Sequence, residues 1–330
     1  MKKLRVGILF GGKSTEHEVS LQSAKNVIAH LDPEKFESVP LLLNKEGEGV
    51  ATEKSIVELR QIVDVIFPVL HGGSGEDGTV QGLLKLSGIP FVGAGVLGSA
   101  IGMDKDVMKR LLRDAGIPIA QFLTIQEKTA PLYEEVVKVL GIPFFVKPAN
   151  AGSSVGVHKV ESATGYTTAL RDAFLYDTKV LIEETIVGRE IEVAVLGNEN
   201  PQASVPGEII PKNGFYSYEA KYLDSDGAKL RVPAQLDAET SKKIQEQAKQ
   251  VFQVLSCEGI GRVDFFLREN GDILVNEINT LPGFTAISMY PKLWEASGVS
   301  YTALVTRLID LALERHEREQ QLKTVYQSGE

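Results

Sequence analysis

The beginning of the chain combines a short apolar run with a helical spacing of apolar residues. Val6 to Phe10 is the apolar run, and the polar segment Gly11 to Glu18 follows it. Beyond this segment, apolar side chains recur at Leu21, Ala24, Val27, Ile28 and Leu31. A short apolar run predicts a buried strand, and a period near 3.6 predicts an amphipathic helix. The order strand, loop, helix is typical of an α/β fold.

The same alternation continues along the chain, with one change of pattern beginning near Gly93. Asp104 has the features of an N-cap for a helix that ends near Gly116, so we place a domain boundary near Met103. Strands and short helices are expected over Ser38 to Leu43, Val63 to Leu70, Gln121 to Ile125, Leu132 to Leu140, Pro143 to Lys147, Val157 to Val160, Ala163 to Phe174, Val180 to Glu183 and Ile191 to Leu196. A long amphipathic helix is expected over Glu239 to Leu255, and a charged terminal helix from Tyr301.

A β-hairpin is the most clearly specified element. Apolar residues run from Val263 to Leu267 and again from Ile273 to Ile278. Asn270-Gly271 between them is a strong signal for a tight two-residue turn. With these two residues at the turn, Glu269 faces Asp272 across the hairpin.

Counting back from this turn gives the register of the hairpin. Asp264 falls opposite Glu277, and Arg262 falls opposite Asn279. All four side chains share one face, because a strand repeats every two residues. Two facing carboxylates destabilise a sheet unless a positive charge lies between them.

A metal ion would supply this positive charge. Asp264, Glu277 and Asn279 form a set of hard oxygen ligands, which suits Mg²⁺ bound to phosphates better than zinc. The alternative is a solvated hairpin face with ordinary charges. Phe266 and Val275, which this register places on the same face, argue that the face is partly buried.

Two glycine patterns match the consensus spacing of nucleotide-binding motifs but not the structural context that these motifs require. Gly7, Gly12, Lys13 and Ser14 match the Walker A spacing, but the residues between the two glycines form the predicted strand. The loop after that strand instead offers Glu16 at a carboxyl end, where open α/β sheets bind ligands.

The second pattern lies in the loop from His71 to Gly78. Its glycines have the dinucleotide spacing, but Glu76 and Asp77 would repel a pyrophosphate. We interpret this glycine-rich loop as the edge of a substrate domain, where it presents His71, Glu76 and Asp77, or as a structural cap.

A third loop, Ala149 to Gly156, is rich in glycine and serine and lies between two predicted strands. Such a loop can fold over phosphates, with Lys105 and Lys147 as the matching cations, or it can be a flexible turn. The stretch from Phe215 to about Arg231 is aromatic and charged, and we expect it to be a mobile lid.

Composition limits the class of protein. With 330 residues the chain should hold two or three domains, and its net charge of -9 argues against a nucleic-acid surface. Cys257 is the single cysteine, so neither a disulfide within the chain nor a zinc cluster is expected. Apolar runs are too short for a membrane span, and no cleavage-site pattern follows the basic start, so we expect a cytoplasmic protein without membrane contact.

Together these stretches resemble the ATP-grasp superfamily, and within it the D-alanine:D-alanine ligase family. The resemblance covers nearly the whole chain and is carried by Gly11 to Ser20, His71 to Gly78, Met103 to Lys105, Lys147 to Gly156, Tyr218 to Tyr222, Gly261 to Asp264 and Asn276 to Gly283. It implies an N-terminal α/β domain over residues 1–102, a central subdomain over 103–187 and a C-terminal domain over 188–330. The lid at 215–231 and the hairpin at 261–283 belong to the last, and two β-sheets should clasp ATP.

The resemblance also implies roles for residues. The magnesium ligands would be Asp264, Glu277 and Asn279. The nucleotide contacts would be Lys105 and Lys147 at the phosphates, Glu183 and the backbone of Ile186 at the adenine, Glu190 at the ribose, and Ser154, Glu184 and Asn276 around them.

For the amino-acid substrates, the resemblance implies that Glu16 holds the first ammonium group, with Ser153 and Tyr222 as its hydrogen-bonded partners. Arg262 and Gly283 would surround the transferred phosphate and the oxyanion. The remaining substrate positions would be His71, Lys221, Ser288 and Met289.

The implied reaction joins two D-alanines for peptidoglycan synthesis through an acyl phosphate. It would use ATP with two Mg²⁺ ions, which Mn²⁺ could replace, in a homodimer. The alternatives are a ligase that joins D-alanine to D-lactate or D-serine, and a non-catalytic nucleotide-binding module. Tyr222 and Met289 both favour D-alanine in the family pattern, and the presence of all site residues argues against the module.

Overall fold

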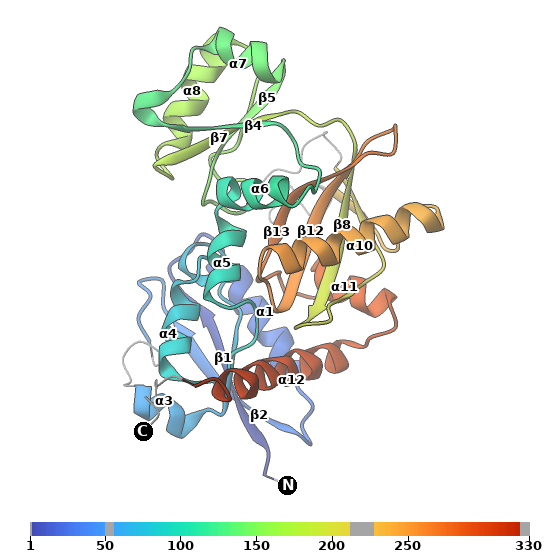
Figure 1. The fold of residues 1–330 in the computed structure, drawn as a ribbon. Helices are drawn as coiled ribbons and strands as arrows, with labels where there is room; N and C mark the ends of the chain where they lie inside the picture. Colours follow the sequence, from blue (N-terminus) through green and yellow to red (C-terminus); the bar gives the residue numbers. More distant parts are fainter. Residues whose placement is uncertain (1, 50–55, 212–227, 324–330) are drawn as a thin grey trace, which may run out of the picture.

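The computed structural model describes residues 2–49, 56–211 and 228–323, and it contains three β-sheets with helices packed on them (Figure 1). Each sheet takes its strands from one of the three predicted domain ranges. The exact boundaries of those domains stay predictions.

The N-terminal sheet is parallel, with the order β2-β1-β3. Its strands are β1 (Leu4–Gly11), β2 (Phe36–Leu43) and β3 (Val65–Pro68). Parallel neighbours require crossover connections, which α1 (His17–Ala29) and α3 (Ile56–Ile62) supply. The short 3-10 helix η1 (Gly73–Gly75) and α4 (Thr79–Ser87) follow β3. Gly7 to Phe10 are part of β1, which agrees with our rejection of a Walker A loop there.

The central sheet is antiparallel, with the order β4-β7-β5-β6, and lies at the top of Figure 1. Its strands are β4 (Phe122–Gln126), β5 (Phe144–Pro148), β6 (His158–Val160) and β7 (Lys179–Glu184). The 3-10 helix η2 (Glu127–Thr129) follows β4, and α7 (Tyr133–Leu140) and α8 (Ala163–Ala173) cover one face. The polar side chains of β5 and β7 therefore point away from these helices.

The third sheet is also antiparallel, with the order β11-β10-β8-β12-β13 and β9 paired to β8. Its strands are β8 (Arg189–Gly197), β9 (Gln202–Ala203), β10 (Gly207–Pro211), β11 (Ala228–Arg231), β12 (Gly259–Leu267) and β13 (Ile273–Asn279). One face packs its apolar side chains against α10 (Ala238–Val254). The last four residues of the predicted lid, 228–231, form β11 and pair with β10.

Two pairs of helices join these parts. Between the N-terminal and central sheets lie α5 (Val96–Met103) and α6 (Lys105–Asp114), and the predicted N-cap at Asp104 is confirmed. After the hairpin come α11 (Met289–Ala296) and α12 (Tyr301–Gln320). In Figure 1, α12 runs across the N-terminal sheet, and one hydrophobic core combines side chains of both. No helix in the described ranges is long and apolar enough to cross a bilayer.

Candidate active site

The hairpin brings together the charged residues predicted for a metal. Asp264 pairs with Glu277 and Arg262 pairs with Asn279, as predicted. The predicted two-residue turn is wrong, because the amide of Arg268 donates to the carbonyl of Asp272 at 2.9 Å. The loop therefore has three residues, 269–271, and ends in Gly271 at φ +89°. Three-residue loops of this kind end in a left-handed residue, which glycine adopts without strain.

A β-bulge restores the predicted pairing at the site. Phe265 pairs with Val275, whereas Asp264 pairs with Glu277, so Asn276 is an extra residue on β13. Phe266 consequently lies opposite Leu274, and Val275 is fully buried on the other face, which corrects the prediction that it shares the face of Asp264. The bulge therefore places two consecutive residues, Asn276 and Glu277, on the same side of the sheet.

Arg262 is the positive charge between the carboxylates of this face. Its guanidinium donates to both carboxylate oxygens of Asp264 at 2.7 Å and lies 3.1 Å from Glu192 on β8. Burial disfavours its charge, but Asp264 and Glu192 outweigh burial and raise the pKa of Arg262 well above its ordinary value. A planar fork that meets two carboxylates is rigidly oriented.

Lys105, at the start of α6, is the second cation of this face. Its Nζ lies 3.4 Å from Glu277 and donates to the carbonyl of Ala151 at 2.8 Å. Its backbone amide donates to the carbonyl of Ala149 at 3.1 Å. Lys105 thus joins the hairpin to the loop that we predict to cover phosphates.

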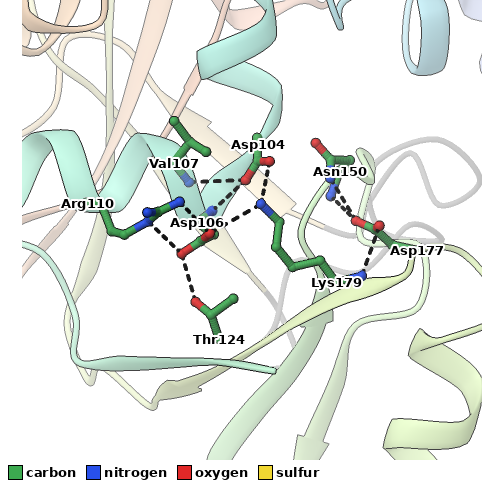
Figure 2. A network of polar contacts seen from close by, with 8 residues as sticks. All are labelled: Asp104, Asp106, Val107, Arg110, Thr124, Asn150, Asp177 and Lys179. Carbon is green, nitrogen blue, oxygen red and sulfur yellow. Dashed lines mark hydrogen bonds and ion pairs between the residues drawn. The ribbon is translucent and has the colours of Figure 1, made fainter. Parts of the chain in front are cut away.

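Figure 2 shows how α6 and this loop are fixed to β7. Lys179 bonds to Asp104 at 2.5 Å and to Asp106 at 3.2 Å. Asp177, two residues earlier, accepts hydrogen bonds from the backbone and the side-chain amide of Asn150, at 2.8 and 2.9 Å. The start of β7 therefore holds both the beginning of α6 and the root of the predicted phosphate loop.

The predicted phosphate loop has an unusual backbone. Ser153 and Ser154 have φ values of +52° and +61°, which are left-handed conformations. Each such residue that is not glycine costs about 1 kcal/mol or more and is held only by surrounding structure. Successive residues bent in this way can turn backbone N–H groups toward an anion. The strain is therefore consistent with an anion-binding loop.

Three charged side chains meet beneath this loop. Lys147 on β5 and Lys109 on α6 each form an ion pair with Glu183 on β7, through different carboxylate oxygens. Burial would raise the pKa of Glu183, but the two lysines outweigh burial and lower it. The cluster therefore holds two cations and one anion away from water.

The remaining predicted nucleotide residues lie along the connection from β7 to β8. Glu184 accepts a hydrogen bond from the amide of Gln121 at 2.8 Å and lies 3.5 Å from Arg268. Ile186 lies in the connection itself, and Glu190 pairs with Phe266 on the same face as Asp264. Their contacts to a nucleotide stay predictions.

Glu16 lies where the N-terminal sheet meets the predicted phosphate loop. The residue precedes α1 and is 7% exposed. A Cβ atom on Gly72 would come within 2.6 Å of its carboxylate, and one on Gly152 within 3.9 Å. Glycine at position 72 therefore gives the carboxylate its space, and its φ of +70° also favours glycine.

His71 connects the N-terminal part to the segment that follows the hairpin. Its Nδ1 lies 3.2 Å from the carbonyl of Leu281, and its Nε2 lies 2.9 Å from the hydroxyl of Ser23. Burial lowers the pKa of His71, so a neutral ring that donates from Nδ1 and accepts from Ser23 fits both contacts. Ser23 in turn accepts from the amide of Phe284 at 3.2 Å. These bonds fix the segment that contains Gly283.

The last predicted substrate residues lie near the start of α11. The hydroxyl of Ser288 would be 2.8 Å from a Cβ atom on Gly283, so the two residues are in close contact. Met289 is 6% exposed and packs in the main core against Gly207. Its role in substrate choice stays a prediction. Lys221 and Tyr222 lie outside the described residues, as does most of the predicted lid.

Glu76, whose carboxyl group is influenced by the charge of Glu16, has a raised pKa. It accepts a hydrogen bond from the amide of Gly72 at 2.8 Å. Burial and the charge of Glu16 raise its pKa to about 8, although the Gly72 amide, Lys105 and Arg262 oppose this shift. The Glu76 carboxyl therefore binds a proton more tightly than an ordinary glutamate does.

We expect Glu76→Gln to stabilise the protein increasingly as the pH rises. Because the folded-state pKa is raised from 4.5 to about 8, the folded state binds the proton more tightly, and stability is lost between these two values. Glutamine does not lose a proton. Thermal unfolding across this range should show a growing difference in Tm from the unmutated protein. A difference that does not change with pH, or the same trend in the exposed Glu127→Gln, would contradict this reading.

The donor set on the hairpin fits a magnesium site. Asp264 and Glu277 supply carboxylates and Asn279 supplies an amide, and all are oxygen ligands. In the described part of the chain, no group of three or more His, Cys, Asp or Glu side chains could hold a metal alone. Phosphate oxygens and waters would complete the coordination shell, as is usual for Mg²⁺.

Sequence reasoning missed three residues of this region. Lys109 follows Lys105 by four residues on a predicted helix, so the shared helical face could have revealed it. Glu192 follows Glu190 by two residues on a predicted strand, which places both on one face. Ser23 gave no signal, because a serine on a helix is ordinary until its partners are known.

Two family models match the chain. The model described as "D-ala D-ala ligase N-terminus" matches residues 5–62 and 49–94, and "D-ala D-ala ligase C-terminus" matches residues 111–310.

Curated relatives match over the full length. The D-alanine-D-alanine ligase of Oceanobacillus iheyensis is 52% identical and covers 100% of both chains. That of Shouchella clausii is 51% identical over 98% of each chain, and ligase A of Escherichia coli K12 is 51% identical over 98% of this chain and 100% of its own.

Solved structures show the same architecture. The D-alanine-D-alanine ligase from Coxiella burnetii superposes with a TM-score of 0.86 at 38% identity, covering 97% of each chain. The VanG D-Ala:D-Ser ligase from Enterococcus faecalis superposes with a TM-score of 0.84 at 37% identity, covering 94% of this chain and 100% of its own.

Proposed function

This chain belongs to the D-alanine:D-alanine ligase family, and we propose from that premise how its own residues join two D-alanines. The predicted α/β fold of the ATP-grasp type and the resemblance on which it rested are confirmed. The enzyme is an ATP-dependent ligase that forms the C–N bond of D-alanyl-D-alanine for peptidoglycan synthesis.

The first D-alanine binds where the N-terminal sheet meets the loop 149–156. Glu16 pairs with its ammonium group, because this carboxylate is buried where the N-terminal part meets the loop, next to Gly72 and Gly152. The substrate carboxylate then points toward the hairpin. It takes the γ-phosphoryl group of ATP, and the amine of the second D-alanine displaces the phosphate.

Charge neutralisation around the transferred phosphate comes from side chains of the hairpin and of α6. Asp264, Glu277 and Asn279 hold magnesium, which when bound neutralises phosphate charge. Arg262 and Lys105 lie on the same face and stabilise the negative charge that develops during transfer. The observation that carries this proposal is the pairing of Asp264 with Glu277 between these two cations.

We extend the proposal to the number of metal ions and to the oligomeric state. The site takes two Mg²⁺ ions, and Mn²⁺ can replace them because it also prefers oxygen ligands. The protein works as a homodimer in the cytoplasm, where ATP is available. Leu86 on α4 and Leu97 on α5 are exposed apolar side chains that a second copy could cover.

Product analysis tests the reaction. We expect phosphate release with D-alanine, and D-alanyl-D-alanine as the main product at neutral and alkaline pH when D-alanine, D-serine and D-lactate compete. The rate should rise with pH, because the second D-alanine must react as the free amine. Ester formation with D-lactate as readily as dipeptide formation near pH 7 would instead support the lactate-using alternative. A dominant D-alanyl-D-serine product would support the function of the VanG neighbour, and no phosphate release would support a binding module.

A further inference from the structure

Lys109 is a fully buried lysine that the proposed reaction does not use. Its exposed fraction is 0%, and it lies on α6 one turn after Lys105. Its ammonium group contacts Oε1 of Glu183, while Lys147 contacts Oε2 of the same carboxylate. A buried lysine is costly, so a role beyond packing is expected for Lys109.

The two lysines have different surroundings although they share one carboxylate. Lys147 lies on β5 directly before the loop 149–156, and its side chain is 10% exposed. Lys109 lies behind Glu183 and has no exposed surface. Lys147 can therefore turn toward a bound phosphate, whereas Lys109 must stay with Glu183.

We propose that Lys109 is a positioning residue that keeps Glu183 neutralised when Lys147 leaves it for the phosphates of the nucleotide. The proposal rests on the proposed function and on the role that the family resemblance implies for Lys147, a contact with the phosphates. Each lysine uses its own oxygen of Glu183, so the release of one does not disturb the other.

The physical reason is the cost of an unpaired buried charge. If Lys109 were absent, the departure of Lys147 would leave the carboxylate of Glu183 buried without a cation, which is strongly unfavourable. Lys147 would then remain paired with Glu183 and would be withheld from the phosphates. The defect should be largest with ligands that carry phosphates.

Calorimetric binding of MgATP, MgADP and adenosine without D-alanine tests this idea. Lys109→Met should weaken MgATP and MgADP binding about 10-fold or more, the effect of one lost bond to a charged group. Adenosine binding should weaken less than MgADP binding, because adenosine does not need Lys147 and depends on this cluster only through the predicted adenine contact of Glu183. Lys109→Arg should restore much of the loss, and Lys243→Met, which removes a surface lysine paired with Glu239, should change none of the three.

Removal of the carboxylate gives the decisive comparison. In the Glu183→Gln background no carboxylate holds Lys147 back from the phosphates, so adding Lys109→Met should change MgADP binding by less than about two-fold. If the single Lys109→Met protein does not fold, a change of more than about two-fold in the Glu183→Gln background still overturns the proposal.

A purely structural role predicts other results. In that case Lys109→Met would weaken adenosine and MgADP equally, or would weaken MgADP equally in the presence and absence of Glu183, and either result would overturn the proposal. Dipeptide formation by the unmutated protein tests the reaction separately, so failure of the two ideas can be told apart.

Discussion

Replacement of Glu277 by glutamine is expected to lower kcat at least ~100-fold while the protein stays folded, the scale seen when one group that stabilises a transition state is lost. Glutamine keeps the shape of the side chain but removes the charge that would hold magnesium opposite Asp264. It also leaves Lys105 without its carboxylate partner at 3.4 Å. The loss should be partly reversed at high magnesium concentration, because weaker binding can be offset by mass action.

The matched control is Glu269→Gln, in the exposed turn of the same hairpin. It removes the same charge from the same element, away from the paired carboxylates, and should change kcat less than about two-fold. Steady-state phosphate release and thermal unfolding of both variants give the comparison. Near-normal turnover of Glu277→Gln at ordinary magnesium would refute the assignment of the hairpin.

Arg262→Met is expected to reduce both activity and stability. The variant leaves Asp264 and Glu192 close together on a half-buried face without their shared cation. Breaking a buried ion pair in this way costs about 3 to 5 kcal/mol of the free energy of unfolding. Loss of the charge near the transferred phosphate should lower kcat by roughly 100- to 1000-fold.

Arg262→Lys separates charge from geometry, because lysine restores the cation without the planar fork. Its free energy of unfolding, measured in urea, should lie between those of the unmutated protein and the methionine variant. Arg307→Met, which removes a surface arginine paired with Glu314 on α12, is the control and should leave both quantities nearly unchanged. Equal stability of Arg262→Met and the unmutated protein would show that the buried charges do not depend on Arg262.

Local patterns in the sequence were sufficient for most elements and for the pairing of the polar residues on the hairpin. The pairing of Asp264 with Glu277 and the N-cap at Asp104 were both predicted, because each depends on residues close in sequence. The predicted turn has one residue fewer than the turn in the structure. The predicted pairing of Asp264 with Glu277 is nevertheless correct, because the bulge adds one residue to β13. Asn-Gly suits the two-residue turn, but glycine also suits the left-handed last position of a three-residue loop, so the local sequence alone does not decide between them.

Contacts between distant segments were not predictable from one sequence. α5 was missed, because Val96–Met103 is rich in glycine and apolar residues and shows no clear amphipathic period. Its Gly98 and Gly102 pack so closely on Ser256 and Thr280 that a Cβ atom would approach within 2.6 and 2.7 Å. Glycine is needed at these two positions because residues distant in the sequence pack against them. A local sequence pattern does not show such contacts.

The bulge on β13 also sets how densely oxygen donors can converge. Side chains on one face of a regular strand are separated by two residues, or about 6.6 Å along its axis. A regular strand therefore offers a site only every second side chain, as with Glu277 and Asn279. At the bulge, Asn276 and Glu277 stand next to each other on the same side, and Asn279 follows two residues later. The bulge thereby gives one face of a short strand three polar side chains within four residues. In an uninterrupted strand, the consecutive residues Asn276 and Glu277 would point to opposite faces.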